Sequence, residues 1–126
     1  MKKLEKEIAL YLKERGWDTM TPSDMAKSIS IESAELLELF QWGNAGIAET
    51  KANEARMQKI REELADVFIY CLDMAVLLGI DSEAAIREKL EHNKKKYPAK
   101  EMIQANNKGH ERYLEIKQQY RDEKRL

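Results

Sequence analysis

Apolar residues recur every three or four positions along most of this chain, which is the spacing of helices that bury one face. In and just before the stretch 28–42, this apolar stripe consists of Met25, Ile29, Leu36, Leu39 and Phe40. No segment shows the strict alternation of apolar and polar residues that indicates a half-buried strand. The pattern therefore predicts an all-α protein.

The residues that begin and end helices divide the chain into four core helices. Gly16, Gly43 and Gly79 suit helix C-termini, because glycine adopts the left-handed conformation that often ends a helix. Thr21 followed by Pro22 suits a helix start, since a threonine side chain caps the first turn and proline fits its first position. The predicted helices lie at about 3–15, 22–42, 53–78 and 82–96. Their short connections favour an antiparallel four-helix bundle.

Two segments lie outside these four helices. Residues 43–51 are predicted to form a polar connection between the second and third helices. The tail at 111–126 is charged and helix-prone, and Tyr113, Ile116 and Tyr120 would give it a narrow apolar stripe. A chain of 126 residues is large enough for one core, so we expect a single domain over 1–126 with an additional C-terminal helical tail.

Acidic residues interrupt the apolar faces of the second and third predicted helices. Glu32 falls inside the apolar stripe of the second helix, and Glu35 lies beside it. The third helix is apolar almost all round over 64–80, with Asp66, Tyr70 and Asp73 as its main polar interruptions. Glu63 lies three residues before Asp66 on the same face. Two adjacent helices would therefore aim four carboxylates at one interior point.

Four like charges in a low-dielectric site repel one another unless a cation lies among them. Oxygen ligands suit Mg²⁺, Mn²⁺ or Ca²⁺, and magnesium held by carboxylates commonly serves to hold phosphates. Carboxylate-bridged iron in helical bundles usually needs Glu-x-x-His pairs, and neither His92 nor His110 follows a glutamate at that spacing. The alternative is a solvated acidic face, because a chain rich in glutamate contains such pairs by chance, as Glu88 and Glu91 show.

Charge and cysteine content limit the partners and the compartment. Lysine and arginine (22) nearly balance aspartate and glutamate (23), so the net charge of -1 provides no basic field for nucleic acid. The single cysteine, Cys71, forms no internal disulfide, which favours a reducing compartment. The first residues are too charged for a signal peptide, and no apolar run approaches the length of a membrane span. We expect a soluble, cytoplasmic protein without nucleic-acid or membrane partners.

The acidic residues also resemble a known family signature. Glu32-x-x-Glu35 followed by Glu63-x-x-Asp66 resembles the E-x₂-E…E-x₂-D pattern of the all-α nucleoside triphosphate pyrophosphohydrolases. Within that superfamily, the chain is most similar to the MazG-like and dCTP pyrophosphatase branch. The segments 35–42, 63–70 and 93–98 follow in family order, so the similarity covers a core of about 16–98.

This resemblance implies a helical bundle that forms dimers or tetramers and cleaves a nucleoside triphosphate to the monophosphate and pyrophosphate. Glu32, Glu35, Glu63 and Asp66 match the family's magnesium ligands, with manganese a plausible substitute. A carboxylate that is not fully used as a ligand would accept the proton of the attacking water. The two candidates for this catalytic base are Glu35 and Glu38. For Glu38, the alternative is a solvated residue on the helix surface with no catalytic role.

The resemblance also implies substrate-binding residues. Trp42 and, at a less regular spacing, Trp17 match aromatic residues near the base, and Tyr70 matches a tyrosine beside the sugar. Asn93 and Lys96 match residues that approach the phosphates. Structural roles are the alternatives: Trp17 as a core-edge residue, Tyr70 as a buried hydroxyl, and Lys96 as a cation at a helix C-terminus.

Two other functions stay open at this point. In the first, the chain is a non-catalytic helical interaction module of the same fold, and the presence of all four acids argues against this function. In the second, the chain catalyses a related reaction, such as the hydrolysis of dUTP or of phosphoribosyl-ATP. A histidine that some relatives use before the first tryptophan is absent, so the preferred base is open.

Overall fold

The structure is a computed structural model that describes residues 1–104 and 109–125. These residues form seven helices and no strand, so the predicted all-α class is confirmed. None of the described helices is both long enough and apolar enough to cross a membrane. The chain divides into two compact units, Met1–Ser82 and Glu83–Leu126, and each is described by itself.

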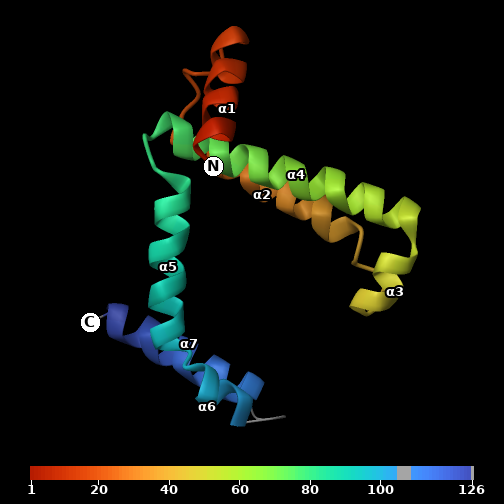
Figure 1. Cartoon of the computed structure of the whole chain (residues 1–126), viewed down its shortest axis with the longest axis vertical. Coiled ribbons are helices and arrows are strands. Elements are labelled where there is room, and N and C mark those ends of the chain that lie inside the picture. Colours follow the sequence, from red (N-terminus) through yellow and green to blue (C-terminus); the bar gives the residue numbers. More distant parts are fainter. Residues whose placement is uncertain (105–108, 126) are drawn as a thin grey trace. The chain divides into compact units, whose positions relative to one another are not determined.

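The first unit contains α1 (Lys2–Glu14), α2 (Pro22–Glu38), α3 (Ile47–Ala52) and α4 (Glu54–Leu77). Helices α2 and α4 lie side by side and run in opposite directions, with the short α3 at the turn between them (Figure 1). Helix α1 packs on α4. The antiparallel pairing of α2 with α4 brings together the two helices that carry the acidic residues.

Local signals set the ends of these helices largely where the sequence predicts them. The Thr21 hydroxyl accepts a hydrogen bond from the Asp24 N–H at 3.2 Å, and Pro22 occupies the first turn of α2. The Asn53 side chain caps α4 in the same way, accepting from the Arg56 N–H at 3.0 Å. Gly16 and Gly79 have φ angles of 68° and 67°, a left-handed conformation that is strained for other residues.

The predicted extent of the second helix is wrong at its C-terminal end. Helix α2 ends at Glu38, and residues 39–42 form turns. The Arg56 guanidinium of α4 donates to the Leu39 carbonyl and lies 5.1 Å from the centre of the Phe40 ring. This contact satisfies a carbonyl at the helix end and places Phe40 against α4. The predicted polar connection is also wrong in part, because it contains α3.

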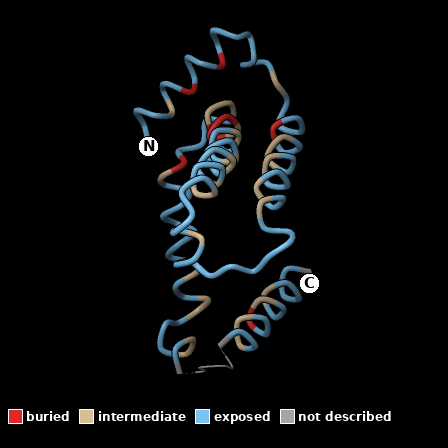
Figure 2. Tube along the Cα trace, turned by 90° about the vertical axis from the view of Figure 1, so that its right-hand side faces the viewer, coloured by how far each residue is buried: buried red, intermediate tan, exposed pale blue. Residues whose placement is uncertain are grey.

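Few side chains of the first unit are fully buried. Ile8 and Leu12 of α1 pack with Leu72 of α4, and Val76 and Leu77 lie against this cluster. Figure 2 shows how few buried residues there are along the trace. Burial of each large aliphatic side chain contributes about 1.5–3 kcal/mol, so this cluster fixes α1 on the C-terminal half of α4.

The second unit contains α5 (Ser82–Lys96, its first residue in the first unit), α6 (Ala99–Gln104) and α7 (Gly109–Arg125). Helix α6 occupies a segment for which the sequence predicted no helix. The stripe predicted on the tail forms along α7: Ile116 is 4% exposed, and the Tyr113 ring lies 5.0 Å from that of Tyr97. The single domain and the four-helix bundle stay predictions.

Candidate functional site

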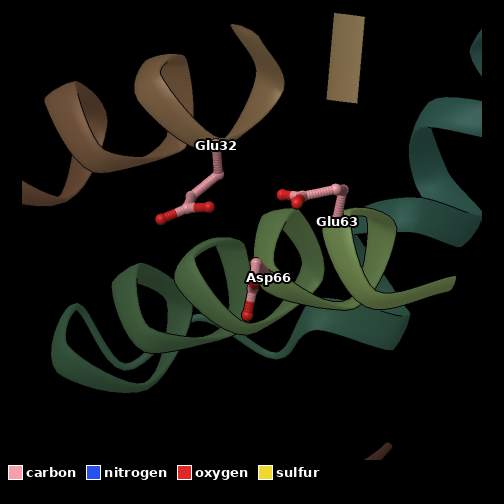
Figure 3. Close-up of side chains that lie close together, drawn as sticks. All are labelled: Glu32, Glu63 and Asp66. Atoms are coloured by element: carbon pink, nitrogen blue, oxygen red, sulfur yellow. The ribbon is translucent and has the colours of Figure 1, made fainter. Parts of the chain in front are cut away.

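Three of the four predicted acids meet between α2 and α4. Glu32 of α2, and Glu63 and Asp66 of α4, each offer a carboxylate oxygen, and these oxygens all lie within 4.8 Å of one another. Figure 3 shows the Glu32 side chain projecting from α2 toward α4, and the Glu63 side chain of α4 pointing toward Glu32. The cluster arises because two acids three residues apart on α4 face an acid on the antiparallel neighbour.

The electrostatics of the cluster favour a bound cation. The pKa of Glu32 is raised by burial and then by a side-chain hydrogen bond and charge repulsion from Glu35, with Asp66 and Glu63 adding to it. The pKa of Glu63 is raised by burial and by the negative charges of Glu35 and Asp66. Both shifts mean that the ionised forms repel one another where no cation is present.

One atom of the cluster lacks a partner. Glu63 Oε2 is buried and makes no hydrogen bond to any described residue. A buried carboxylate oxygen without a donor is costly, and a metal ion or its bound water would satisfy it. The residues present therefore fit a hard divalent cation, by their oxygen ligands, their convergence and this unpaired atom.

A pocket of about 450 Å³ opens beside the acids. Helices α1, α2 and α4 and the turn after α1 form its walls, which consist of Tyr11, Leu12, Trp17, Met20, Glu32, Glu35, Asp66, Ile69, Tyr70 and Asp73. The Trp17 ring packs edge-on against Tyr11 with 5.8 Å between ring centres. The pocket thus joins an acidic region to an aromatic and apolar one, as a phosphorylated aromatic ligand requires.

Tyr70 and Asp73 continue the α4 side of this pocket beyond Asp66. The pKa of Tyr70 is raised by burial and by the negative charges of Glu32 and Asp73, while a hydrogen bond with Ser28 opposes the shift. Asp73 is 3% exposed. The sequence identified Asp73 only as a polar interruption of α4, although its position seven residues after Asp66 is a signal that it shares the acidic face.

Of the other predicted residues of the first unit, some line the pocket and others do not. Glu35 and Glu38 are both exposed, but Glu35 lines the pocket, whereas Glu38, the last residue of α2, is not part of the pocket wall. Trp17 lines the pocket, but Trp42 is 91% exposed in the turn after α2. Within one chain, Trp17 is therefore the tryptophan that lies beside the acids.

Asn93 and Lys96 belong to the second unit. The Lys96 ammonium lies 4.6 Å from the centre of the Tyr120 ring and 5.1 Å from that of Tyr97, which is a cation–π arrangement. The Asn93 carbonyl accepts a hydrogen bond from the Tyr97 N–H at 2.8 Å. The approach of Asn93 and Lys96 to phosphates stays a prediction from the resemblance.

Comparison with known proteins gives the same family from both sequence and structure. Residues 27–111 match the MazG-like family. The dCTP pyrophosphatase 1 proteins of Homo sapiens and Rattus norvegicus are 32% and 30% identical over 93 and 92 residues, or 72% and 71% of this chain. The chain spans about half the length of these curated relatives, 55% and 54%.

A solved structure extends the similarity to the fold. A pyrophosphatase from Archaeoglobus fulgidus matches with a TM-score of 0.68 and 40% sequence identity, covering 78% of this chain and 92% of that one. The family match includes all four predicted acids, α2 from Lys27 onward and the whole of α4. The chain therefore belongs to the MazG-like family of all-α nucleoside triphosphate pyrophosphohydrolases.

Proposed function

We propose that this chain hydrolyses a nucleoside triphosphate to the nucleoside monophosphate and pyrophosphate, and so removes nucleotides from the cellular pool. The observation that carries the proposal is the convergence of the acidic cluster, in which carboxylate oxygens of Glu32, Glu63 and Asp66 lie within 4.8 Å of one another. This cluster lies beside a pocket whose wall includes Trp17. An acidic cluster suits a cation and its triphosphate, and the aromatic wall suits a base. The names of the relatives support the reaction class.

The proposed metal is Mg²⁺, with Mn²⁺ as a substitute. Glu32, Glu63 and Asp66 would hold it, with Glu35 as a further ligand beside Glu32. When bound, the ion neutralises charge on the triphosphate and polarises the phosphorus that is attacked. The ion would also supply the partner that the buried Oε2 of Glu63 lacks among the described residues.

Glu35 is the proposed catalytic base. It lines the pocket, and its negative charge acts on Glu32 and Glu63, so it is close to the convergent acids. Because it is not one of the three, it is the acid least used as a ligand. It would take a proton from water as the water oxygen bonds to the α-phosphorus and the bond to the bridging oxygen breaks. Pyrophosphate then leaves. Glu38 is the weaker choice, because it lies outside the pocket wall.

Self-association is part of the proposal. A second cavity of about 590 Å³ lies between α1 and α4, with mostly apolar walls that include Leu4, Ile8, Phe68 and Leu72. Phe68 is 58% exposed, and an apolar surface of this kind commonly marks a protein contact. Tyr11 and Ile69 line both cavities, so a second copy seated on the apolar cavity would also support the pocket wall.

This association is tested by light scattering after size-exclusion chromatography. We expect Phe68→Asp to lower the molar mass of the particle, because a charge would be buried in the contact. Ile47→Asp is the matched control, since Ile47 is 77% exposed on α3 and lies outside the cavity. A monomeric wild type, or equal masses for all three proteins, would contradict the proposed surface.

The proposed location is the cytoplasm. Cys71 is an exposed, free thiol, which a reducing compartment preserves. Neither nucleic acid nor membrane is a proposed partner, because the net charge is close to zero. Fluorescence imaging of the tagged protein in its own cells tests this location, and a signal confined to another compartment would contradict it.

Product analysis tests the proposed reaction. Each of the four dNTPs, dUTP and the four rNTPs is incubated with the protein and Mg²⁺, and the products are separated by ion-exchange chromatography. We expect monophosphate and pyrophosphate from at least one of them, and dCTP is the first substrate to try because of the relatives' name. An Asp66→Asn protein purified in parallel shows whether a contaminant is responsible.

Other outcomes point to different functions. Diphosphate with orthophosphate would place the cut at the wrong bond and reject the mechanism. Turnover of dUTP alone would favour a dUTPase. Phosphoribosyl-ATP is assayed separately, and its turnover without that of any other nucleotide would favour a phosphoribosyl-ATP hydrolase. No product from any nucleotide, in a folded protein with Mg²⁺ or Mn²⁺, would favour a non-catalytic interaction module of the same fold.

A further inference from the structure

The pocket contains a buried carboxyl group that the proposed chemistry does not use. Asp73 lines the pocket and is 3% exposed, and its Oδ1 makes no hydrogen bond to any described residue. Buried polar atoms in folded proteins nearly always have a partner, so an unpaired one needs an explanation. A ligand group that enters the pocket would supply the missing partner.

Asp73 is separated from the metal-binding acids along α4. Asp66, Tyr70 and Asp73 are spaced by four and three residues, so they share one face of the helix. At a rise of 1.5 Å per residue, Asp73 lies about 10 Å along the axis from Asp66. A nucleotide with its phosphates over Asp66 would therefore place its far end near Asp73.

The surroundings of Asp73 suit the base rather than the phosphates. Trp17, Met20 and Tyr70 line the same pocket and offer aromatic and apolar surface to a flat ring. The cation that would bind the phosphates is proposed among Glu32, Glu63 and Asp66, and Asp73 is not part of that cluster. The polar groups of a base edge, by contrast, match the hydrogen-bonding capacity of a carboxyl group.

We propose that Asp73 is the specificity-determining residue of this pocket, where it hydrogen-bonds the polar edge of the nucleobase. This inference rests on the proposed pyrophosphohydrolase function and adds to it the group that distinguishes one base from another. Discrimination by a buried hydrogen-bonding group is strong, because the wrong base leaves that group unpaired.

The protonation of Asp73 agrees with this role. Burial raises the pKa of the Asp73 carboxyl group, which favours its neutral form. A neutral carboxyl donates one hydrogen bond and accepts another, as the edges of pyrimidines and of adenine require. The ionised form only accepts, which suits two adjacent donors such as those of guanine.

The test compares substrates with and without a base. Wild type, Asp73→Asn and Asp73→Ala are assayed with each dNTP and with deoxyribose 5-triphosphate, which carries the same phosphates and no base. We expect Asp73→Ala to lower kcat/KM for the preferred dNTP roughly 10- to 100-fold, the effect of one strong hydrogen bond. Turnover of the baseless triphosphate should change by less than about twofold, because no hydrogen bond to a base is lost.

Asp73→Asn sharpens the test, because an amide always donates and accepts, whereas a carboxyl group loses its donor when it ionises. Since burial favours the neutral carboxyl group, we expect Asp73→Asn to keep the ranking of the dNTPs that Asp73→Ala abolishes. Ser82→Ala is the matched control: Ser82 is 8% exposed and its Oγ also has no hydrogen-bond partner among the described residues, yet it lies outside the pocket. It should leave the ranking unchanged.

The outcomes separate this inference from the proposed function. An equal loss for every substrate, including the baseless one, would make Asp73 a structural residue and overturn the inference. An unchanged ranking in both Asp73 variants with full activity would overturn it as well. Absence of nucleotide turnover in the wild type would instead refute the proposed function. Melting curves of each variant show that the fold is intact.

Discussion

Two buried carboxyl oxygens have no hydrogen-bond partner among the described residues, one in the acidic cluster beside the pocket and one in the wall at its other end, and their surroundings differ. At the acidic end, Glu63 Oε2 lies among Glu32, Glu35 and Asp66. At the other end, burial alone accounts for the raised pKa of Asp73. A cluster of negatively charged groups indicates a bound cation, whereas a buried carboxyl group outside such a cluster indicates a hydrogen-bonding ligand. The neighbours of an unpaired group, more than the group itself, therefore identify what completes it.

The largest expected effect comes from the acidic end. We expect Glu63→Gln to lower kcat by at least roughly 100-fold. This effect is larger than that of substituting a residue that only hydrogen-bonds to a metal ligand. The loss should be similar for every dNTP and for the baseless triphosphate, unlike the loss in Asp73→Ala. Steady-state assays measure it, and Glu88→Gln on α5 is the control for a lost negative charge. Wild-type activity in Glu63→Gln would show that the acidic end is not the metal site.

The next largest effect is expected on KM when the tryptophans are substituted. Trp17 lines the pocket, while Trp42 is 91% exposed within a single chain. We expect Trp17→Leu to raise KM for the preferred dNTP roughly 10-fold, because a stacking surface worth about 1–3 kcal/mol is lost. Trp42→Leu should have a smaller effect in the same assay. The opposite order would mean that self-association brings Trp42 to the site and that one chain does not complete the pocket.

Metal binding should stabilise the fold. A ligand that binds only the folded state adds about 2.7 kcal/mol at a concentration of 100 times its Kd, so Mg²⁺ should raise the Tm of the wild type. Asp73→Asn should show the same rise, and Glu63→Gln should show little or none. Differential scanning calorimetry with and without Mg²⁺ measures all three. Equal rises in all three proteins would place the stabilising ion elsewhere.

The smallest effect is a pH dependence of stability at the other end. The pKa of Asp73 is raised from its usual 3.8, so the folded state holds this proton to a higher pH than the unfolded state does. Its contribution to stability is therefore fully present below the usual pKa and is lost as the pH rises through the raised one. Asp73→Asn lacks this loss, so its Tm should exceed that of the wild type by a few degrees at neutral pH. The difference should shrink in acid, and a constant difference would contradict a raised pKa.

Local signals made much of the first unit predictable. The end of α1, the start of α2 and both ends of α4 depend on Gly16, Thr21, Pro22, Asn53 and Gly79, and each acts within one turn of its own position. The acidic cluster was predictable for the same reason, since three-residue spacing places acids on one helix face. The short helices α3 and α6 have six residues each, too few to show an amphipathic period.

Long-range contacts explain what the sequence did not show. The early end of α2 depends on Arg56, seventeen residues after the Leu39 carbonyl to which it donates. The different positions of Trp17 and Trp42 depend on the turns after α1 and α2. Asp73 has an obvious place on α4, but its lack of a partner follows only from the packing of α1 and α2 around it.

A crystal structure with Mg²⁺ and a dNTP whose α–β link resists hydrolysis tests both ends of the pocket at once. We predict metal density among Glu32, Glu63 and Asp66, with the α-phosphate beside it. The base should lie against Trp17, with its polar edge within hydrogen-bonding distance of Asp73. A nucleotide bound outside this pocket, or one with its phosphates toward Asp73, would contradict the account.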